Sequence, residues 1–187
     1  MNVKKKNIIA AILIIIINVI IDQLTKALIV SNMQLHSSIP LINGKNGSIF
    51  ELNYIHNKGA AWGMLSKQTT LLTIISIIVM AAVGYIFWNI KDARKFRILR
   101  ISFALLIGGA IGNMIDRIRL HYVIDFLYFR LIDFPVFNYA DICVTVALFL
   151  IIFSMIFKYR VDDFDVLLGD KKYDEKTDTY TSVREKK

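Results

Sequence analysis

The sequence predicts a mainly α-helical membrane protein with four transmembrane helices and a small β-sheet at the membrane surface. Hydrophobic residues make up 56% of the 187 residues, against the roughly 45–50% of soluble domains, and the mean hydropathy is +0.53. Four apolar runs are long enough, or nearly so, to cross a hydrocarbon core about 30 Å thick. Burying this much apolar surface without lipid is difficult, which argues against a soluble globular enzyme.

The four predicted helices cover about residues 8–30, 69–90, 98–115 and 136–158. The first follows three lysines, as a signal peptide does, but no small-x-small cleavage site comes after it. Because its sequence continues helically to Lys26, we expect a retained helix. The second has no charged residue, and Gly108, Gly109 and Gly112 in the third permit close contact with neighbouring helices.

A β-strand is predicted in the long connection after the first helix. Phe50, Leu52 and Tyr54 alternate with side chains of the opposite face, which is the pattern of a half-buried strand. Residues 57–59 (Asn-Lys-Gly) are a turn signal, and residues 60–63 add small side chains and a tryptophan typical of a membrane interface. A small sheet lying on the membrane surface fits this pattern.

The formal net charge of +8 lies entirely in residues 1–157, because residues 158–187 hold eight basic and eight acidic side chains. Lysines and arginines gather before the first helix and between residues 89 and 100, and such clusters face the cytoplasm. We therefore expect both termini in the cytoplasm and the connections 31–67 and 116–135 outside. The positive charge is then a signal of membrane orientation, and nucleic-acid binding is not expected.

A single integral-membrane domain is expected over residues 1–160, because no low-complexity linker or repeat marks a second one. Residues 161–187 are charged and lack apolar periodicity. This composition is typical of a solvated cytoplasmic extension, and no function is assigned to it.

Eight polar residues from four separated segments are expected together at the outer ends of the helices and in the outer connections. Ionisable groups at membrane depth are energetically costly and therefore mark functional sites by default. The eight are Asp22, Asn57, Asn113, Asp116, Arg117, Asp125, Asn138 and Asp141.

Metal and nucleophile chemistry have little support in the sequence. The three histidines lack paired ligand spacing, and Cys143, the single cysteine, has no neighbouring histidine. A G-x-S-x-G motif is also absent. We therefore expect no metal site, and Cys143 is interpreted as a small core residue.

A pair of carboxyl groups remains as the candidate catalytic machinery. Two aspartates near a low-dielectric boundary do not both ionise readily, so one keeps its proton while the other activates water, as in aspartic proteases. Asp141 is one candidate. Its partner is open among Asp125, Asp133 and Asp116, since spacing does not decide among them.

Other interpretations of the polar residues compete with catalysis. A transporter or scaffold subunit would spread polar groups through the inner half of the membrane, but the second and fourth helices are almost purely apolar there. The G-x-G-D and G-x-S-G motifs of other intramembrane proteases are absent. Asp22 and Lys26, four residues apart, are interpreted mainly as a helix-stabilising ion pair. Structural and functional roles are equally open for Asp116 with Arg117.

Five blocks of sequence, in order, resemble the lipoprotein signal peptidases, also called signal peptidase II. The blocks are Asp22–Lys26, Asn57–Gly63, Gly108–Arg117, Val123–Phe126 and Phe137–Asp141. The resemblance covers about residues 8–157 and implies four transmembrane helices with an extracytoplasmic β-cradle between the first and second. Departures are small: Ile124 stands where valine is usual, Lys58 stands where a small polar residue is common, and the tail from Val161 has no counterpart.

The resemblance implies a catalytic dyad of Asp125 and Asp141, which selects Asp125 over Asp133. The implied reaction removes the signal peptide from diacylglyceryl-modified prolipoproteins by cutting before the lipid-modified cysteine, at the outer leaflet of the bacterial cytoplasmic (inner) membrane. Positions that match substrate-binding or site-supporting residues are Asp22, Lys26, Asn57, Gly59, Asn113, Asp116, Arg117 and Asn138. No cofactor is implied, and the partners are these preprolipoproteins and membrane lipid. A monomer and inhibition by globomycin-type transition-state mimics are expected.

Overall fold

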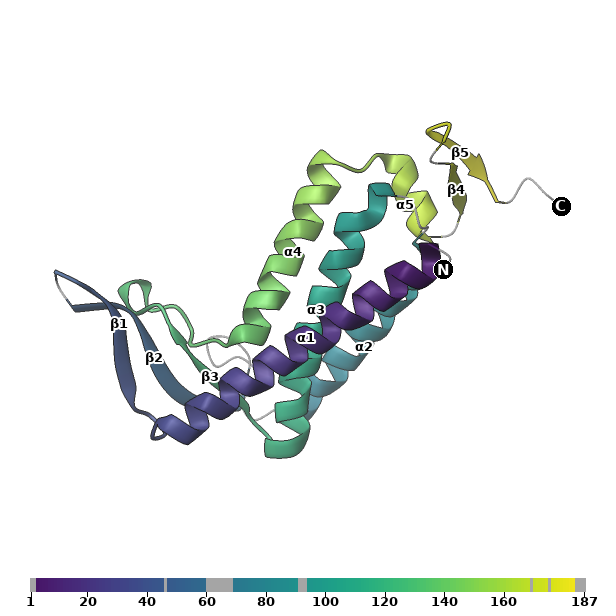
Figure 1. Cartoon of the computed structure of the whole chain (residues 1–187). Helices are drawn as coiled ribbons and strands as arrows, with labels where there is room; N and C mark the ends of the chain where they lie inside the picture. The colour runs from purple at the N-terminus through teal and green to yellow at the C-terminus, as the bar shows by residue number, and fades with distance from the viewer. Residues whose placement is uncertain are drawn as a thin grey trace.

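Four long helices and a three-stranded sheet make up most of the protein (Figure 1). The computed structural model describes residues 3–45, 47–59, 69–90, 94–168, 170–174 and 176–183. The helices are α1 (Val3–Asn32), α2 (Thr69–Asn89), α3 (Arg97–Leu120) and α4 (Tyr139–Phe157). Within the described ranges, these four are long and apolar enough to cross a membrane, which confirms the predicted fold class.

Helix α3 lies at the centre of the bundle and contacts α1, α2 and α4. In its apolar segment 50% of the residues are buried inside the protein, against 17%, 6% and 22% for α1, α2 and α4. The predicted role of the glycines is confirmed. A Cβ at Gly109 would lie 2.5 Å from the carbonyl oxygen of Ala140, and one at Gly112 would lie 2.5 Å from the carboxylate of Asp22. Glycine therefore allows α1 and α4 to approach the outer end of α3.

The helix ends differ from the prediction at the site of interest. Helix α3 continues past Ile115 to Leu120 and ends where His121 adopts a left-handed conformation with φ 63°. Asp116 therefore lies inside the helix instead of beyond it. Helix α4 begins at Tyr139, three residues after the predicted start, because Asn138 caps it in an extended conformation.

The sheet is antiparallel, with strands β1 (Ser38–Gly44), β2 (Gly47–Asn57) and β3 (Val123–Tyr128) in that order. The predicted strand is confirmed as part of β2, although a register shift between Leu52 and Ile55 interrupts the strict alternation. Strand β3 comes from the connection between α3 and α4, so the sheet is not built between the first two helices alone. Residues 60–63, predicted to carry small side chains and an interfacial tryptophan, lie outside the described residues.

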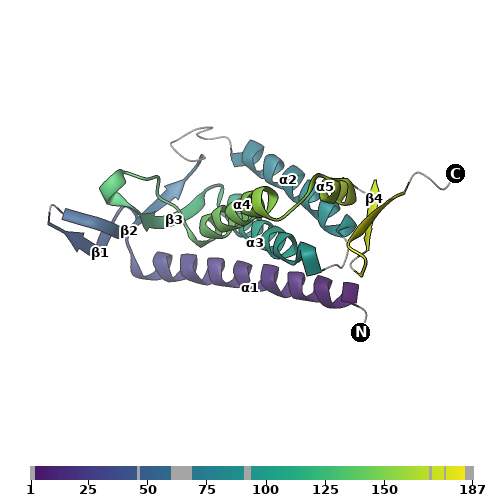
Figure 2. The ribbon, with the colours of Figure 1, turned by 90° about the horizontal axis from the view of Figure 1, so that it is seen from above.

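The tail differs from the predicted solvated extension. Its described residues form α5 (Val161–Leu168) and a hairpin of β4 (Lys171–Asp174) and β5 (Thr179–Ser182), at the end of the bundle away from the sheet (Figure 2). Asp163 is fully buried, pairs with Lys95 at 2.8 Å and accepts a hydrogen bond from the Tyr180 hydroxyl at 2.8 Å. Val166 packs into the same core as Phe96, the last residue of the short helix η2 (Arg94–Phe96). The tail packs because Val166, Tyr173 and Tyr180 contact this core, most of whose other members are distant in the chain, and a local sequence pattern does not reveal such contacts.

Candidate active site

Strand β3 carries Asp125 into the interior, where 2% of the residue is exposed. Its carboxylate accepts hydrogen bonds from the side-chain amides of Asn57 at 2.8 Å and Asn138 at 2.7 Å. The backbone N–H of Gly59 donates to the Asn57 side-chain oxygen at 2.9 Å, which confirms the predicted turn and directs the Asn57 amide toward Asp125. Burial, followed by repulsion from Asp141, raises the pKa of Asp125 to about 7, although both amide donors oppose the shift.

Asp141 lies in the first turn of α4, and its carboxylate helps to cap that helix. It accepts a hydrogen bond from the backbone N–H of Asn138 at 3.1 Å, while the Asn138 side-chain oxygen accepts one from the backbone N–H of Asp141 at 3.1 Å. The other carboxylate oxygen accepts from the Asn113 amide at 2.8 Å. The positive end of the helix dipole therefore stabilises a negative charge on Asp141.

Asn113 and Asn138 connect the two carboxyl groups. The Asn138 amide lies 2.9 Å from the Asn113 side-chain oxygen and also donates to Asp125, and the Asn113 amide donates to Asp141. A continuous chain of side-chain hydrogen bonds thus runs from Asp125 through two asparagines to Asp141. Since each asparagine both donates and accepts, the chain holds the two carboxyl groups in one arrangement.

Lys26 forms the charged support beneath these groups. It is 2% exposed, and its ammonium group lies 2.9 Å from Asp22, 2.8 Å from Asp116 and 3.0 Å from the side-chain oxygen of Asn113. The expected ion pair of Asp22 and Lys26 is therefore present, and Asp116 joins it. Among the described residues no ion pair joins Asp116 to Arg117.

Gln23 is a site residue that the sequence analysis missed. Its amide lies 3.1 Å from a carboxylate oxygen of Asp22, 3.1 Å from one of Asp116 and 3.3 Å from the carbonyl oxygen of Gly112. These hydrogen bonds therefore connect α1 to the outer half of α3. Its position beside Asp22 in the first sequence block was the one available signal.

A cavity of about 540 Å³ opens at the two aspartates. Its polar lining comes from Asp125, Asp141, Asn57, Gly59, Asn113, Arg117 and Thr145. Phe129, Phe134, Val136 and Val146 contribute to a wall that is largely apolar. A site of this kind suits a ligand that has both polar and apolar groups.

Arg117 is the one cation among the described residues that line this cavity. Its Nε is buried and has no hydrogen-bond partner among the described residues, and its charge acts on Asp141, Asp125 and Asp116. A buried donor without a partner is costly, which suggests that an oxygen of a bound ligand completes its hydrogen bonding.

The third candidate aspartate lies elsewhere. Asp133 follows the short helix η3 (Arg130–Ile132), is exposed, and accepts a hydrogen bond from the Tyr128 hydroxyl at 2.5 Å. It does not line the cavity. The structure brings together all ten residues that the resemblance indicated. Six of them line the cavity: Asp125, Asp141, Asn57, Gly59, Asn113 and Arg117. Lys26, Asp22 and Asp116 lie beneath these six, and Asn138 connects Asn113 to Asp125 by hydrogen bonds.

Comparison with known proteins shows which family has this sequence and this site. Residues 14–157 match the family model described as signal peptidase (SPase) II. The chain is 37% identical to a lipoprotein signal peptidase of Lactiplantibacillus plantarum over 147 residues, which cover 79% of this chain and 92% of that protein. It is 40% identical to a lipoprotein signal peptidase of Symbiobacterium thermophilum, with 80% and 96% covered.

Two solved structures of bacterial membrane enzymes are also similar. One, solved by the in meso method at 2.3 Å resolution, has a TM-score of 0.70 and 38% identity over 79% of this chain and 87% of its own. The other, at 1.9 Å resolution, has a TM-score of 0.69 and 37% identity over 80% and 94%. The family model spans most of the membrane bundle and includes both cavity aspartates. The chain therefore belongs to the signal peptidase II family of membrane proteases.

Proposed function

We propose that Asp125 and Asp141 are the catalytic dyad of an aspartic endopeptidase that removes the signal peptide from diacylglyceryl-modified prolipoproteins. The scissile bond is the peptide bond before the lipid-modified cysteine. The observation that carries this proposal is that both carboxyl groups, which come from β3 and α4, line one largely apolar cavity. Water activation by paired carboxyl groups needs no metal or cofactor.

The surroundings of the two aspartates favour different roles. Asp141, at the positive end of α4, holds the negative charge and takes a proton from the attacking water. Asp125, with a pKa of about 7, keeps a proton up to neutral pH and donates a hydrogen bond to the scissile carbonyl. The water oxygen bonds to the carbonyl carbon, and the C–N bond then breaks as Asp141 passes the proton taken from the water to the amine nitrogen. The products are the carboxylate of the signal peptide and the free amine of the lipid-modified cysteine.

The other site residues hold this machinery or the substrate. Asn57, Asn113 and Asn138 orient the two carboxyl groups, and Gly59 orients Asn57. Arg117 binds a carbonyl or ester oxygen of the substrate through its open donor. The apolar wall accepts acyl chains and the apolar part of the signal peptide. Asp22, Lys26 and Asp116 form the charged support.

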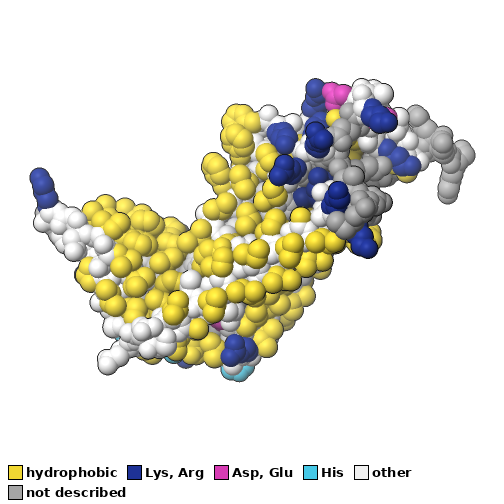
Figure 3. Space-filling view, viewed as in Figure 1, with side chains coloured by type: hydrophobic (Ala, Val, Ile, Leu, Met, Phe, Trp, Pro, Cys, Tyr) yellow, Lys and Arg dark blue, Asp and Glu magenta, His cyan; other side chains and the backbone are white. Residues whose placement is uncertain are grey.

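We place the protein in the bacterial cytoplasmic (inner) membrane, with both termini in the cytoplasm and the cavity at the outer leaflet. In Figure 3 lysines and arginines gather around the end of the bundle that carries α5, while apolar side chains cover the flank of the helices. This distribution supports the orientation. Residues 1–160 act as one peptidase domain, and residues 161–187 belong to its cytoplasmic side.

We propose that the enzyme acts as a monomer, because both aspartates come from the same chain, one on β3 and one on α4. We also propose inhibition by globomycin-type transition-state mimics, because a compound with a polar group for the two carboxyls and apolar groups for the wall would fit this cavity.

The test is cleavage of a diacylglyceryl-modified preprolipoprotein by the purified protein in detergent. We expect Asp125→Asn and Asp141→Asn each to lose nearly all activity, while the matched variant Asp133→Asn keeps it, because Asp133 lies outside the cavity. The unlipidated precursor is the control substrate and is expected to stay uncut. An inactive Asp133→Asn with an active Asp125→Asn would overturn the assignment of the dyad. Equal cleavage of both precursors would overturn the substrate class.

A further inference from the structure

A second cavity lies at the opposite end of the bundle from the aspartates, between residues 7–14 of α1 and the first residues of α3. Its volume is about 180 Å³. Helix α1 contributes Asn7, Ala10, Ala11 and Ile14 to the lining, and α3 contributes two arginines, Arg97 and Arg100. At about 1.5 Å per residue, Arg100 lies about 20 Å along α3 from Asn113 of the active site. The two cavities are therefore separate.

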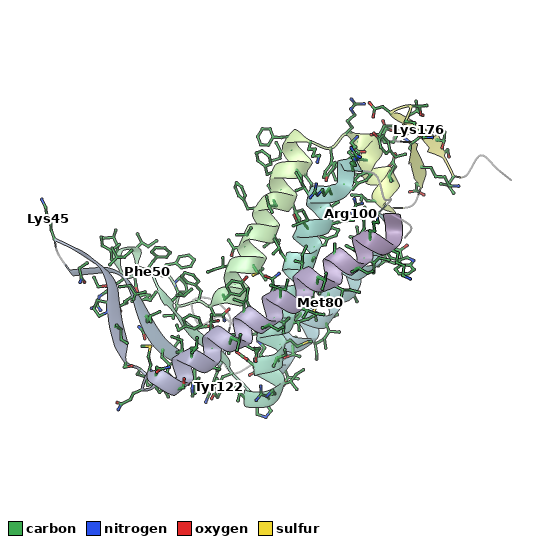
Figure 4. The ribbon with its side chains drawn as sticks, in the orientation of Figure 1. Lys45, Phe50, Met80, Arg100, Tyr122 and Lys176 are labelled. Carbon is green, nitrogen blue, oxygen red and sulfur yellow. The ribbon has the colours of Figure 1, made fainter. Side chains whose placement is uncertain are left out.

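The charge of this second cavity is positive. Arg97 and Arg100 are three residues apart, which places them on one face of α3, and the described lining contains no acidic residue. Arg100 is 8% exposed and lies beside the N-terminal part of α1 (Figure 4). Guanidinium groups bind phosphate oxygens through two parallel N–H donors, so this pair suits a phosphate monoanion.

The cavity also has an apolar part, which lies beside the two arginines. From Asn7 to Ile14 the lining extends about 10 Å along α1, which in the orientation proposed above runs from the membrane surface toward the hydrocarbon core. Below Asn7 the α1 side is formed by two alanines and an isoleucine, and the small side chains of Ala10 and Ala11 leave the space open. A ligand that is anionic at the surface and apolar below matches this order.

We propose that this cavity binds an anionic phospholipid of the inner leaflet. Arg97 and Arg100 hold the phosphate of the head group, and the first carbons of an acyl chain lie over Ala10, Ala11 and Ile14. Basic pockets between transmembrane helices on the cytoplasmic side have the same recognition chemistry. The proposed substrate is a poor occupant, because a signal peptide carries a positive n-region that the two arginines repel. The inference is independent of the peptidase reaction.

The test measures lipid binding by native mass spectrometry on the delipidated full-length protein in detergent. Phosphatidylglycerol and phosphatidylcholine with identical acyl chains are titrated separately, and inorganic phosphate is the probe for a free-anion site. We expect phosphatidylglycerol to bind at least fivefold more tightly than phosphatidylcholine. Arg97→Gln is expected to weaken phosphatidylglycerol binding about fivefold, the fold-change that corresponds to about 1 kcal/mol for one basic residue.

Two further variants complete the test. Ala11→Leu keeps both arginines and fills the apolar part, so we expect weaker binding of both lipids. Arg160→Gln removes an arginine that is exposed, lies outside the cavity and follows α4, and it is expected to leave lipid binding unchanged. Equal binding of the two lipids, an equal effect of Arg160→Gln and Arg97→Gln, or unchanged binding in Ala11→Leu would overturn the proposal. Displacement of phosphatidylglycerol by equimolar inorganic phosphate would also overturn it, in favour of a free-anion site.

Discussion

The carboxylate of Asp22 accepts a hydrogen bond from the backbone N–H of Ala140 at 3.1 Å. Helix α1 thereby holds the residue that precedes Asp141. Asp116 makes the corresponding contact on the other side, accepting at 3.2 Å from the backbone N–H of Ile124, the residue before Asp125. Lys26 lies between the two supporting carboxylates. Each aspartate of the proposed dyad is thus positioned through its chain neighbour by an acid that does not itself line the cavity.

Lys26→Met is expected to lower the stability of the fold by about 3–5 kcal/mol, because it leaves Asp22 and Asp116 buried without their cation. Unfolding by denaturant in detergent measures this loss. Lys5→Met, at an exposed position in the first turn of the same helix, is the matched control and is expected to change stability little. A Lys26→Met protein as stable as the Lys5→Met protein would show that Lys26 does not support the site.

Gly112→Ala is expected to lower both stability, by about 1–3 kcal/mol, and peptidase activity. The new Cβ would lie 2.5 Å from the Asp22 carboxylate, which forces α1 and α3 apart beneath the dyad. Thermal unfolding and substrate cleavage are the measurements. Gly84→Ala is the control, because a Cβ at Gly84 of α2 meets nothing within 4 Å. There the substitution is expected to be neutral or to stabilise by about 0.5–1 kcal/mol. The same response at both glycines would contradict the close packing described above.

Peptidase activity is expected to fall as the pH rises through about 7, because Asp125 then loses the proton that it donates to the scissile carbonyl. The measurement is kcat/KM against pH with the lipidated precursor. Asp133→Asn should keep the wild-type profile. A rate that stays constant from pH 6 to pH 9 would argue against a protonated Asp125 in the reaction.

The stability of the fold is also expected to depend on pH, because of the same proton on Asp125. The pKa of Asp125 is raised from its ordinary value of 3.8 to about 7, so the folded state binds more protons than the unfolded state between these values. Stability therefore declines as the pH rises from about 4 to about 7 and levels off above that. Denaturant unfolding across this range should show the decline in the wild type and a flatter curve in Asp125→Asn. A wild-type curve that rises over this interval would contradict the raised pKa.

Arg117→Lys is expected to lower kcat/KM about 10–100-fold with little change in stability. The buried Nε of Arg117 lacks a protein partner among the described residues. Its removal therefore weakens substrate binding in the transition state more than it lowers the stability of the fold. Steady-state cleavage and thermal unfolding distinguish the two effects. Arg119→Gln, at an exposed position outside the cavity on the same helix, should behave as wild type. Full activity in Arg117→Lys would show that a cation alone suffices at this position.

The amino-acid sequence by itself determined the membrane bundle and indicated most of the polar residues that gather at the candidate site. Helices α1, α2 and α4 follow from apolar runs, because a local stretch of about 20 apolar residues is enough to span the hydrocarbon core as a helix. Polar residues such as Asn113 and Asp141 stood out because membrane-spanning segments otherwise lack them. The β2 strand was visible in a short alternating pattern.

Only the tertiary structure decided which groups touch. From the residues alone the partner of Asp141 stayed open among Asp116, Asp125 and Asp133, because residues 124–126 and 132–134 are near copies (Ile-Asp-Phe) and Asp116 is also close. Pairing of β3 with β2 places Asp125 in the cavity. Asp116 instead forms an ion pair with Lys26, and Asp133 accepts a hydrogen bond from Tyr128. The parts that escaped prediction, among them Gln23 and the packed tail, depend in the same way on contacts between residues far apart in the chain. Such contacts form only when α1, α3 and the sheet pack together, so no local pattern records them.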